Sequence, residues 1–346
     1  MNNYSVAAAT DPARSGATKQ FEESGAALAL DDVRVLADRI IGNIESVISG
    51  KHEAAQMALT VLLAEGHLLI EDVPGLGKTT LARCLARSIG GTYSRIQFTP
   101  DLLPGDVTGV QVYRQGSETF EFRPGGIFAN VVLADEINRG TPKTQSALLE
   151  VMSERTVTVD SVRHEVPRPF LVVATQNPIE MEGTYRLPEA QLDRFLMRLS
   201  VGYPNLESEV LVIMSDCAGV GPDELSPVVD LATLRRAVEE VRAAHIDPAV
   251  VEYAARLEAA TRTHVALRYG ASPRGSIALV RAAQAMAATY GRDYVTPDDI
   301  KEVAKPVLEH RLILTSEAEL NQRGTSDIVD EVLAAIPAPA VGSSVA

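Results

Sequence analysis

The sequence predicts an α/β fold, a parallel sheet with helices on both faces, followed by a smaller all-α domain. Five short apolar runs alternate with helical stretches between residues 68 and 201, and polar residues follow them. Such unalternating runs are typical of parallel strands that are covered on both faces. A glycine-rich loop follows the first run and opens a helix. After Tyr203-Pro204 the strand signal stops, which predicts a separate helical domain.

The N-terminal part divides into a tail and two helices. Residues 1–29 are rich in Ala, Ser, Thr and Gly and predict a disordered tail. From Asp31 onward a helical apolar period begins, formed by Val33, Leu36, Ile40, Ile44 and Val47. A second helix, from about His52 to Ala64, leads into the first strand, Leu68–Ile70. We therefore expect the α/β core to cover residues 30–205.

The segment Glu71–Thr80, which reads EDVPGLGKTT, follows this strand and opens a helix that reaches Ile89. That order presents backbone N–H groups and a helix N-terminus to an anion. Lys78 is expected to reach the β- and γ-phosphates, and the Thr79 hydroxyl to bind Mg²⁺. An ordinary strand-to-helix turn is the alternative. The candidate nucleotide-binding residues are Asp72, Val73, Pro74, Gly75, Leu76, Gly77, Lys78, Thr79 and Thr80.

One position of this loop departs from the G-x-x-x-x-G-K-[ST] pattern. Asp72 stands where the pattern has its first glycine. We expect its carboxylate to point away from the phosphates. Gly75 and Gly77 must then supply the dihedral angles that other residues avoid.

The remaining apolar runs and two inserts complete the predicted core. Further strands are expected in the runs 94–98, 131–134, 170–174 and 196–201, with a helix over 141–154 between two of them. Two pairs of alternating segments predict β-hairpins, Val110–Tyr113 with Thr119–Phe122, and Thr156–Val159 with Val162–Val166.

The second domain is expected to be helical throughout, over residues 230–322. Residues 206–229 would be a connecting helix and linker, and residues 323–346 a C-terminal tail. One helix is expected to bury Leu231, Leu234, Val238 and Val241. Another face would contain Ile277, Val280 and Met286.

Polar residues follow two of the buried strands. Asp135 and Glu136 end the run that begins at Val131, and Asn177 ends the run that begins at Phe170. In an open parallel sheet, ligands bind beyond the carboxyl ends of the strands, where the phosphate loop also lies. Asp135 is then expected to hold Mg²⁺, Glu136 to polarise the attacking water and Asn177 to orient it. Helix caps and a turn before Pro178 are the structural alternatives.

Two arginines are candidates for the positive charge that phosphoryl transfer needs at the γ-phosphate. Arg194 lies in Leu192-Asp-Arg-Phe195, just before the last strand, and Arg274 opens a helix of the second domain. Either could instead be a solvated surface cation.

Composition excludes several classes of protein. The formal net charge of −14 provides no global basic field for nucleic acid or an anionic membrane. Cys84 and Cys217 lie far apart, and the six histidines form no metal-binding spacing. The sequence has neither a run of about 18 apolar residues nor a signal-peptide pattern, so a cytoplasmic protein is expected.

The order of these motifs resembles an AAA+ ATPase, and their wording resembles its MoxR branch. The matching phrases are DLLPGD ending at Asp106, ADEINR ending at Arg139, ATQNP ending at Pro178 and LPEAQLDRF ending at Phe195. The resemblance covers about residues 31–314. It implies a P-loop AAA+ core with two hairpin inserts and a helical lid.

The resemblance also implies roles and partners. Lys78 and Thr79 would be Walker A, Asp135 and Glu136 Walker B, Asn177 sensor 1 and Arg274 sensor 2. Arg194 would be an arginine finger that acts on the next subunit of a hexameric ring. Such ATPases use ATP and Mg²⁺, remodel client complexes and work with proteins that carry a von Willebrand factor A domain. A chelatase motor subunit for metal insertion, or a nucleic-acid motor, is the alternative, although the mixed charges of the hairpins disfavour nucleic acid.

Overall fold

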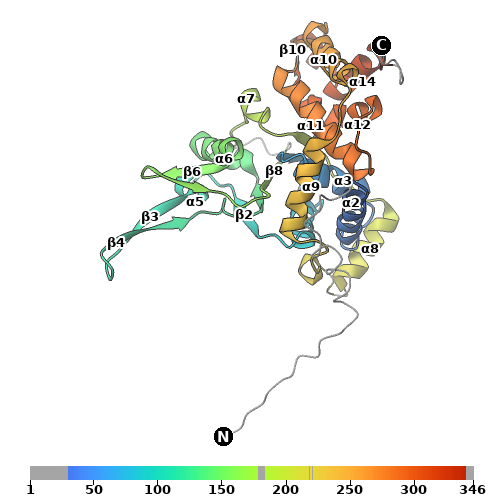
Figure 1. Cartoon of the computed structure of the whole chain (residues 1–346). Coiled ribbons are helices and arrows are strands. Elements are labelled where there is room, and N and C mark those ends of the chain that lie inside the picture. Colours follow the sequence, from blue (N-terminus) through green and yellow to red (C-terminus); the bar gives the residue numbers. More distant parts are fainter. Residues whose placement is uncertain (1–29, 178–183, 218, 220, 340–346) are drawn as a thin grey trace, which may run out of the picture.

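A computed structural model describes residues 30–177, 184–217, 219 and 221–339. The expected N-terminal tail, the end of the C-terminal tail and Pro178 lie outside the described residues. In the described chain, an α/β core carries two hairpins on one side and a helical lid on another (Figure 1). No helix of this described part is both long and apolar enough to cross a membrane.

The core is built on a sheet of five parallel strands, in the order β2-β5-β8-β1-β9. The five predicted runs are confirmed as strands. Their bounds are Leu68–Glu71 for β1, Tyr93–Gln97 for β2, Val131–Asp135 for β5, Leu171–Gln176 for β8 and Met197–Leu199 for β9.

Both faces of this sheet are buried, since successive side chains of a strand point to opposite sides. Leu68 and Ile70 pack into one apolar cluster, and Leu69 packs into the other. The first cluster contains residues of α2 (Leu30–Glu45), α3 (His52–Leu63) and α4 (Lys78–Ser88), whereas the second contains residues of α6 (Pro142–Glu154). This two-sided burial explains why the strands are continuous apolar runs.

The two predicted hairpins are confirmed. The first consists of β3 (Gly109–Arg114) and β4 (Thr119–Pro124), and it follows the short helix α5 (Pro104–Thr108). The second consists of β6 (Thr156–Val159) and β7 (Val162–Glu165). Both extend to the same side of the core (Figure 1), where the rings of Phe122 and His164 stack with centroids 3.8 Å apart. The two inserts are thereby joined to each other.

The rest of the described chain is helical except for one small sheet. The helices are α7 (Glu189–Leu192), α8 (Leu206–Cys217), α9 (Leu231–Ala243), α10 (Pro248–Thr263), α11 (Pro273–Thr289), α12 (Pro297–Leu308), α13 (Ser316–Leu320) and α14 (Thr325–Ala335), with 3₁₀ turns η1 (Ile137–Arg139), η2 (Pro222–Glu224) and η3 (Glu309–Arg311). The strands β10 (Leu267–Tyr269) and β11 (Ile313–Leu314) pair antiparallel. The expectation of a lid without strands was therefore wrong, because strands this short leave no alternation to detect.

The predicted apolar face of α11 also needs correction. Met286 is buried, but 59% of Ile277 is exposed, and the buried positions near it are Ala278, Leu279 and Ala282. Small alanine side chains let α11 pack closely against α12, α2 and α3. The prediction relied on the largest apolar residues of α11, and it therefore did not identify the face that its small alanine residues form.

The structure also differs from the expected tail after residue 322. The helix α14 buries Ile328, Val329 and Val332 against the main apolar cluster of the protein. The spacing of these three residues places them on one side of a helix. The lid therefore continues to about residue 335.

We expect the substitution Ile328→Ala to destabilise the lid by about 2–5 kcal/mol, because it removes a fully buried side chain from a packed cluster. Thermal and urea unfolding measure the loss. Leu320→Ala is the matched control, since Leu320 is 85% exposed, and we expect a change within about 0.5 kcal/mol. Equal effects of the two substitutions would mean that α14 is not part of the folded lid.

Candidate functional site

The loop between β1 and α4 has the backbone form of an anion site. Gly75 and Gly77 have φ angles of +87° and +85°, which side-chain-bearing residues rarely adopt. No atom lies within 4 Å of a Cβ built at either glycine, so the space in front of the loop is open. Gly77 is also the N-cap of α4, where unpaired backbone N–H groups face outward.

This loop lines a cavity of about 500 Å³. The predicted residues that line it are Pro74, Gly75, Leu76, Gly77, Lys78, Thr79, Thr80, Asp135, Glu136 and Asn177. Asp72 and Val73, which we also predicted to bind nucleotide, lie outside the lining. The cavity wall also includes the apolar residues Val47, Ile48, Pro204 and Val212.

The Asp72 carboxylate is directed away from the cavity, toward the chain that follows β9. It accepts hydrogen bonds from Ser200 Oγ at 2.8 Å and from the backbone N–H groups of Val201 and Gly202. Lys51 binds the same segment, since its Nζ donates to the carbonyl oxygens of residues 201, 202 and 203 at 2.7–2.9 Å. Asp72, which stands where the pattern has a glycine, therefore anchors the loop to the residues that follow β9.

Lys78 is one of the cations that line the cavity. Its Nζ donates to the Asp72 carbonyl oxygen at 2.5 Å. Burial lowers the pKa of Lys78, while the carboxylates of Asp72, Asp135 and Glu136 act in the opposite direction. The ammonium group is thus held at the loop by a neutral acceptor that a phosphate oxygen can replace.

Asp135 is paired on both of its oxygens. Oδ1 accepts from Thr175 Oγ1 at 2.6 Å, and Oδ2 accepts from Arg95 Nη2 at 2.5 Å and from Arg95 Nε at 3.1 Å. Arg95 lies on β2, which pairs with β5. The sequence did not predict this contact, because only the pairing of β2 with β5 places Arg95 beside Asp135.

Glu136 is fixed in an uncommon conformation. Its φ angle is +53°, and its backbone N–H donates to Thr175 Oγ1 at 2.9 Å. The Oε2 atom accepts from Gln97 Nε2 at 2.9 Å and from Arg139 Nη1 at 3.1 Å. Gln97 lies two residues after Arg95, so both project from the same face of β2. Strand alternation was the signal that could have identified this pair.

Arg194 and Arg274 do not lie at the phosphate loop of their own chain. Both line a second cavity of about 310 Å³ between the core and the lid. Arg194 Nη1 donates to Leu149 O at 2.6 Å and to Ser153 Oγ at 2.5 Å. Arg274 is 70% exposed, and its Nη1 lies 3.9 Å from Asp193 Oδ2. The structure thus brings the two predicted arginines together but separates them from the other predicted site residues.

Comparisons with known proteins agree with this geometry. The family model "ATPase family associated with various cellular activities (AAA)" matches residues 67–197, and the AAA lid domain model matches residues 259–332. The chain is 49% identical to the uncharacterized protein YeaC of Bacillus subtilis, over 91% of this chain and 98% of that protein. It is 43% identical to the chaperone MoxR1 of Mycobacterium tuberculosis, over 88% and 83% respectively. A crystal structure of a putative ATPase from Cytophaga hutchinsonii superimposes with a TM-score of 0.85 at 38% identity, over 90% of this chain and 97% of that one.

The contact between Arg95 and Asp135 generates a prediction about metal binding. Removing the guanidinium in Arg95→Ala frees one Asp135 oxygen, so we expect half-maximal Mg²⁺-dependent nucleotide binding at a concentration about two- to fivefold lower. A fluorescent ATP analogue titrated at several Mg²⁺ concentrations measures this shift.

Arg83→Ala is the control for this experiment, because Arg83 pairs with Asp223 on η2 and does not line the cavity. We expect its Mg²⁺ dependence to be unchanged. A higher Mg²⁺ requirement in Arg95→Ala would show that Arg95 supports the bound metal–nucleotide complex.

Proposed function

This chain belongs to the MoxR-type AAA+ ATPases, and on that premise we propose that it binds ATP with Mg²⁺ and hydrolyses it as a subunit of a hexameric ring. The observation that carries the proposal is the single cavity in which a phosphate loop, two strand-end acids and a strand-end amide meet. No other chemistry requires this combination as directly as phosphoryl transfer to water.

The cavity suits a nucleotide in size and polarity. A volume of about 500 Å³ lies within the range of small-molecule sites. Its apolar lining residues Val47, Ile48 and Val212 can cover a base, while Lys78 and the open glycine loop can bind the phosphates. The hydroxyl of Thr79 and the carboxylate of Asp135 are hard oxygen ligands of the kind that Mg²⁺ prefers. The metal, when bound, would neutralise charge on the β- and γ-phosphate oxygens.

The residues of the chain then have separate tasks. Lys78 exchanges the Asp72 carbonyl oxygen for a phosphate oxygen. Glu136 accepts a hydrogen bond from the attacking water and orients it toward phosphorus, and Asn177 is close enough within the same cavity to fix the water or the γ-phosphate. Gln97 and Arg139 hold the Glu136 carboxylate in position.

Arg194 and Arg274 are proposed to act on the nucleotide of the neighbouring subunit. The proposal is supported by their shared position in the second cavity, away from their own phosphate loop. In a ring, the second cavity of one subunit could lie against the nucleotide of the next. Each nucleotide would then contact the phosphate loop and acids of its own subunit and the two arginines of its neighbour. We therefore infer that Arg274, like Arg194, supplies charge between subunits.

An exposed apolar surface beside the nucleotide cavity supports assembly. The helix α8 lines the cavity with Val212 and exposes Val210, Leu211, Ile213 and Met214 to solvent. Contiguous exposed apolar side chains of this kind usually mark contact surfaces. We assign this surface to the contact between ring subunits.

The biological task that we propose is chaperone-like remodelling of client complexes, together with a protein that carries a von Willebrand factor A domain. The relative named chaperone MoxR1 supports this class of function. The first hairpin exposes the aromatic pair Tyr113 and Phe120, whose rings lie 5.2 Å apart, and these side chains can contact a client. The stack of Phe122 on His164 would make both hairpins respond together.

The substitution Glu136→Gln tests the hydrolytic role. It keeps size and hydrogen bonding but removes the acceptor charge, so we expect ATP affinity to persist while kcat falls by at least about 100-fold. Steady-state phosphate release and nucleotide titration measure the two quantities. Glu317→Gln, at an exposed position of α13, is the control and should keep the wild-type rate. Near-normal turnover in Glu136→Gln would remove the assigned role, and the locked variant also provides a means of capturing clients.

Mixed rings test the action of the two arginines between subunits. We expect Arg194→Ala to lower kcat by about 10³–10⁵ and Arg274→Ala to lower it as well, while each binds ATP normally at its own site. Mixing either variant with Glu136→Gln should recover activity, because some interfaces then combine an intact acid with intact cations. If Arg274→Ala loses ATP affinity and is not rescued in confirmed mixed rings, Arg274 acts within its own subunit.

A further inference from the structure

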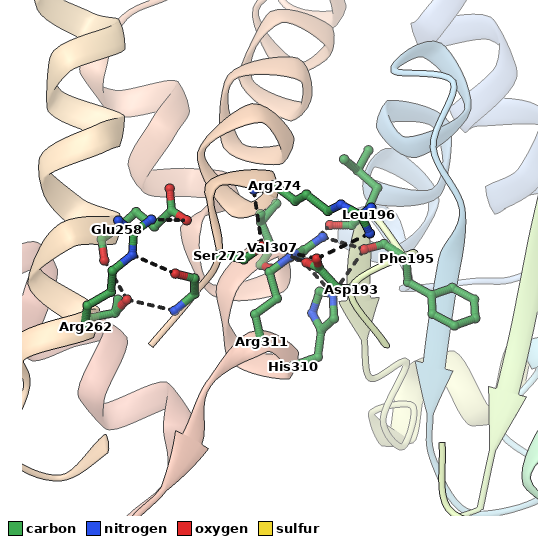
Figure 2. A network of polar contacts seen from close by, with 12 residues as sticks. Asp193, Phe195, Leu196, Glu258, Arg262, Ser272, Arg274, Val307, His310 and Arg311 are labelled. Carbon is green, nitrogen blue, oxygen red and sulfur yellow. Dashed lines mark hydrogen bonds and ion pairs between the residues drawn. The ribbon is translucent and has the colours of Figure 1, made fainter. Parts of the chain in front are cut away.

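A buried arginine of the lid, Arg311, contacts the segment that carries Arg194. Arg311 ends η3 and is 8% exposed. Its Nε donates to Asp193 Oδ1 at 2.9 Å, and Nη2 donates to the Phe195 carbonyl oxygen at 2.6 Å. The Leu196 carbonyl oxygen accepts from Nη1 at 3.3 Å. The lid thus binds the side chain of Asp193, which precedes Arg194, and the backbone of the two residues that follow it, Phe195 and Leu196. Figure 2 shows these contacts of Arg311.

Burial of the Arg311 guanidinium is unfavourable unless its charge and its N–H groups are paired. A guanidinium removed from water needs an opposite charge and acceptors for its five N–H donors. Asp193 supplies the charge, and three backbone carbonyl groups, those of Phe195, Leu196 and Val307, supply acceptors. The planar fork of arginine fits this set, whereas the single ammonium of lysine could not reach all of it. The site therefore fixes both the position and the orientation of the Asp193–Phe195 segment.

The other oxygen of Asp193 faces the helix that carries Arg274. Ser272, the N-cap of α11, donates through Oγ to Asp193 Oδ2 at 3.2 Å, and Arg274 Nη1 lies 3.9 Å from the same oxygen. Figure 2 shows Asp193 between Arg311 and Arg274. One carboxylate thus connects the buried arginine, the start of α11 and the residue next to Arg194.

The strengths of these two ion pairs differ. The contact between Asp193 and Arg311 is 2.9 Å long and both side chains are largely buried. The contact between Asp193 and Arg274 is 3.9 Å long, and the Arg274 side chain is 70% exposed. Because Arg311 neutralises Asp193, Arg274 is only loosely held. Without that neutralisation, the Asp193 carboxylate would be a full negative charge beside both cations, and it would compete with any phosphate for Arg274.

We propose that Arg311 is a positioning residue for the two cations that act between subunits. It neutralises Asp193 and locks the Asp193–Phe195 segment to the lid, so that Arg194 and Arg274 remain directed toward the neighbour's triphosphate. The inference rests on the proposed function, since it needs that action between subunits. Arg311 itself does not touch the nucleotide.

The test uses Arg311→Met in the full-length assembled protein. We expect kcat to fall by at least about tenfold, as for other small misplacements of catalytic groups, while ATP affinity at the variant's own site changes by less than about threefold. Mixing the variant with Glu136→Gln should restore phosphate release, because interfaces then form between an intact acid and intact cations. A defect in folding alone would not be restored in this way.

Two further variants make the experiment specific. Arg311→Lys keeps the buried charge without the fork, so it should fold and show an intermediate rate that mixing also restores. In Arg311→Met/Asp193→Asn the uncompensated carboxylate is gone, so the rate should be several times that of Arg311→Met. Arg292→Met is the matched control, because Arg292 pairs with the buried Asp299 within the same lid but does not line the second cavity. It should lower the melting temperature and leave kcat within about twofold.

The outcomes distinguish a failure of the role assigned to Arg311 from a failure of the proposed action between subunits. If Arg194→Ala is restored by Glu136→Gln but neither Arg311 variant is, or if the Arg311 variants lose their own ATP affinity, Arg311 is a structural lid residue and the inference fails. If Arg194→Ala is not restored in confirmed mixed rings, the proposed action between subunits fails and takes the inference with it. Native mass spectrometry establishes ring composition in each mixture.

Discussion

The common direction of the five strands is the constraint on which the site depends. Since all strands are parallel, the ends of β1, β5 and β8 lie at one edge of the sheet, and residues distant in sequence meet there. The strand β8 lies between β1 and β5, so Asn177 follows the strand that separates the phosphate loop from Asp135. Two apolar clusters hold the sheet from both faces. The two buried apolar clusters therefore fix the positions of the polar residues at this edge of the sheet.

The phosphate loop gains its rigidity from contacts that are unrelated to phosphate. The carboxylate of Asp72 accepts hydrogen bonds from backbone N–H groups of residues 201 and 202, and the ammonium of Lys51 donates to the carbonyl oxygens of residues 201–203. A glycine at position 72 would remove the bonds of the carboxylate. The departure from the usual loop pattern thus ties the nucleotide cavity to the segment that leads into α8 and the lid.

The sequence predicted the local features well and the non-local ones poorly. The five strands, both hairpins and the phosphate loop were predictable because apolar runs, alternation and glycine spacing are local signals. The pair β10–β11 was not, because its strands are only three and two residues long. The helix α14 was missed although Ile328, Val329 and Val332 have helical spacing, because their burial depends on contacts with distant segments. Arg95, Gln97, Lys51 and Arg311 were missed for a related reason, since only the fold reveals their partners. The position of Arg274 beside Asp193 likewise depends on how the lid is placed.

The two cavities contain different parts of the machinery that we propose. The nucleotide cavity is lined by the phosphate loop with Lys51, Arg95 and two acids, and the second cavity by five arginines, including Arg194 and Arg274, with Glu65 and Asp193. If Arg194 and Arg274 act on the nucleotide of a neighbour, as proposed, a monomer would hydrolyse ATP inefficiently. Because Asp193 joins the second cavity to both η3 and α11, any phosphate that draws Arg274 away from it also loosens the start of a lid helix. Under the proposed action between subunits, the nucleotide of one subunit would in this way affect the lid of the next through a single carboxylate.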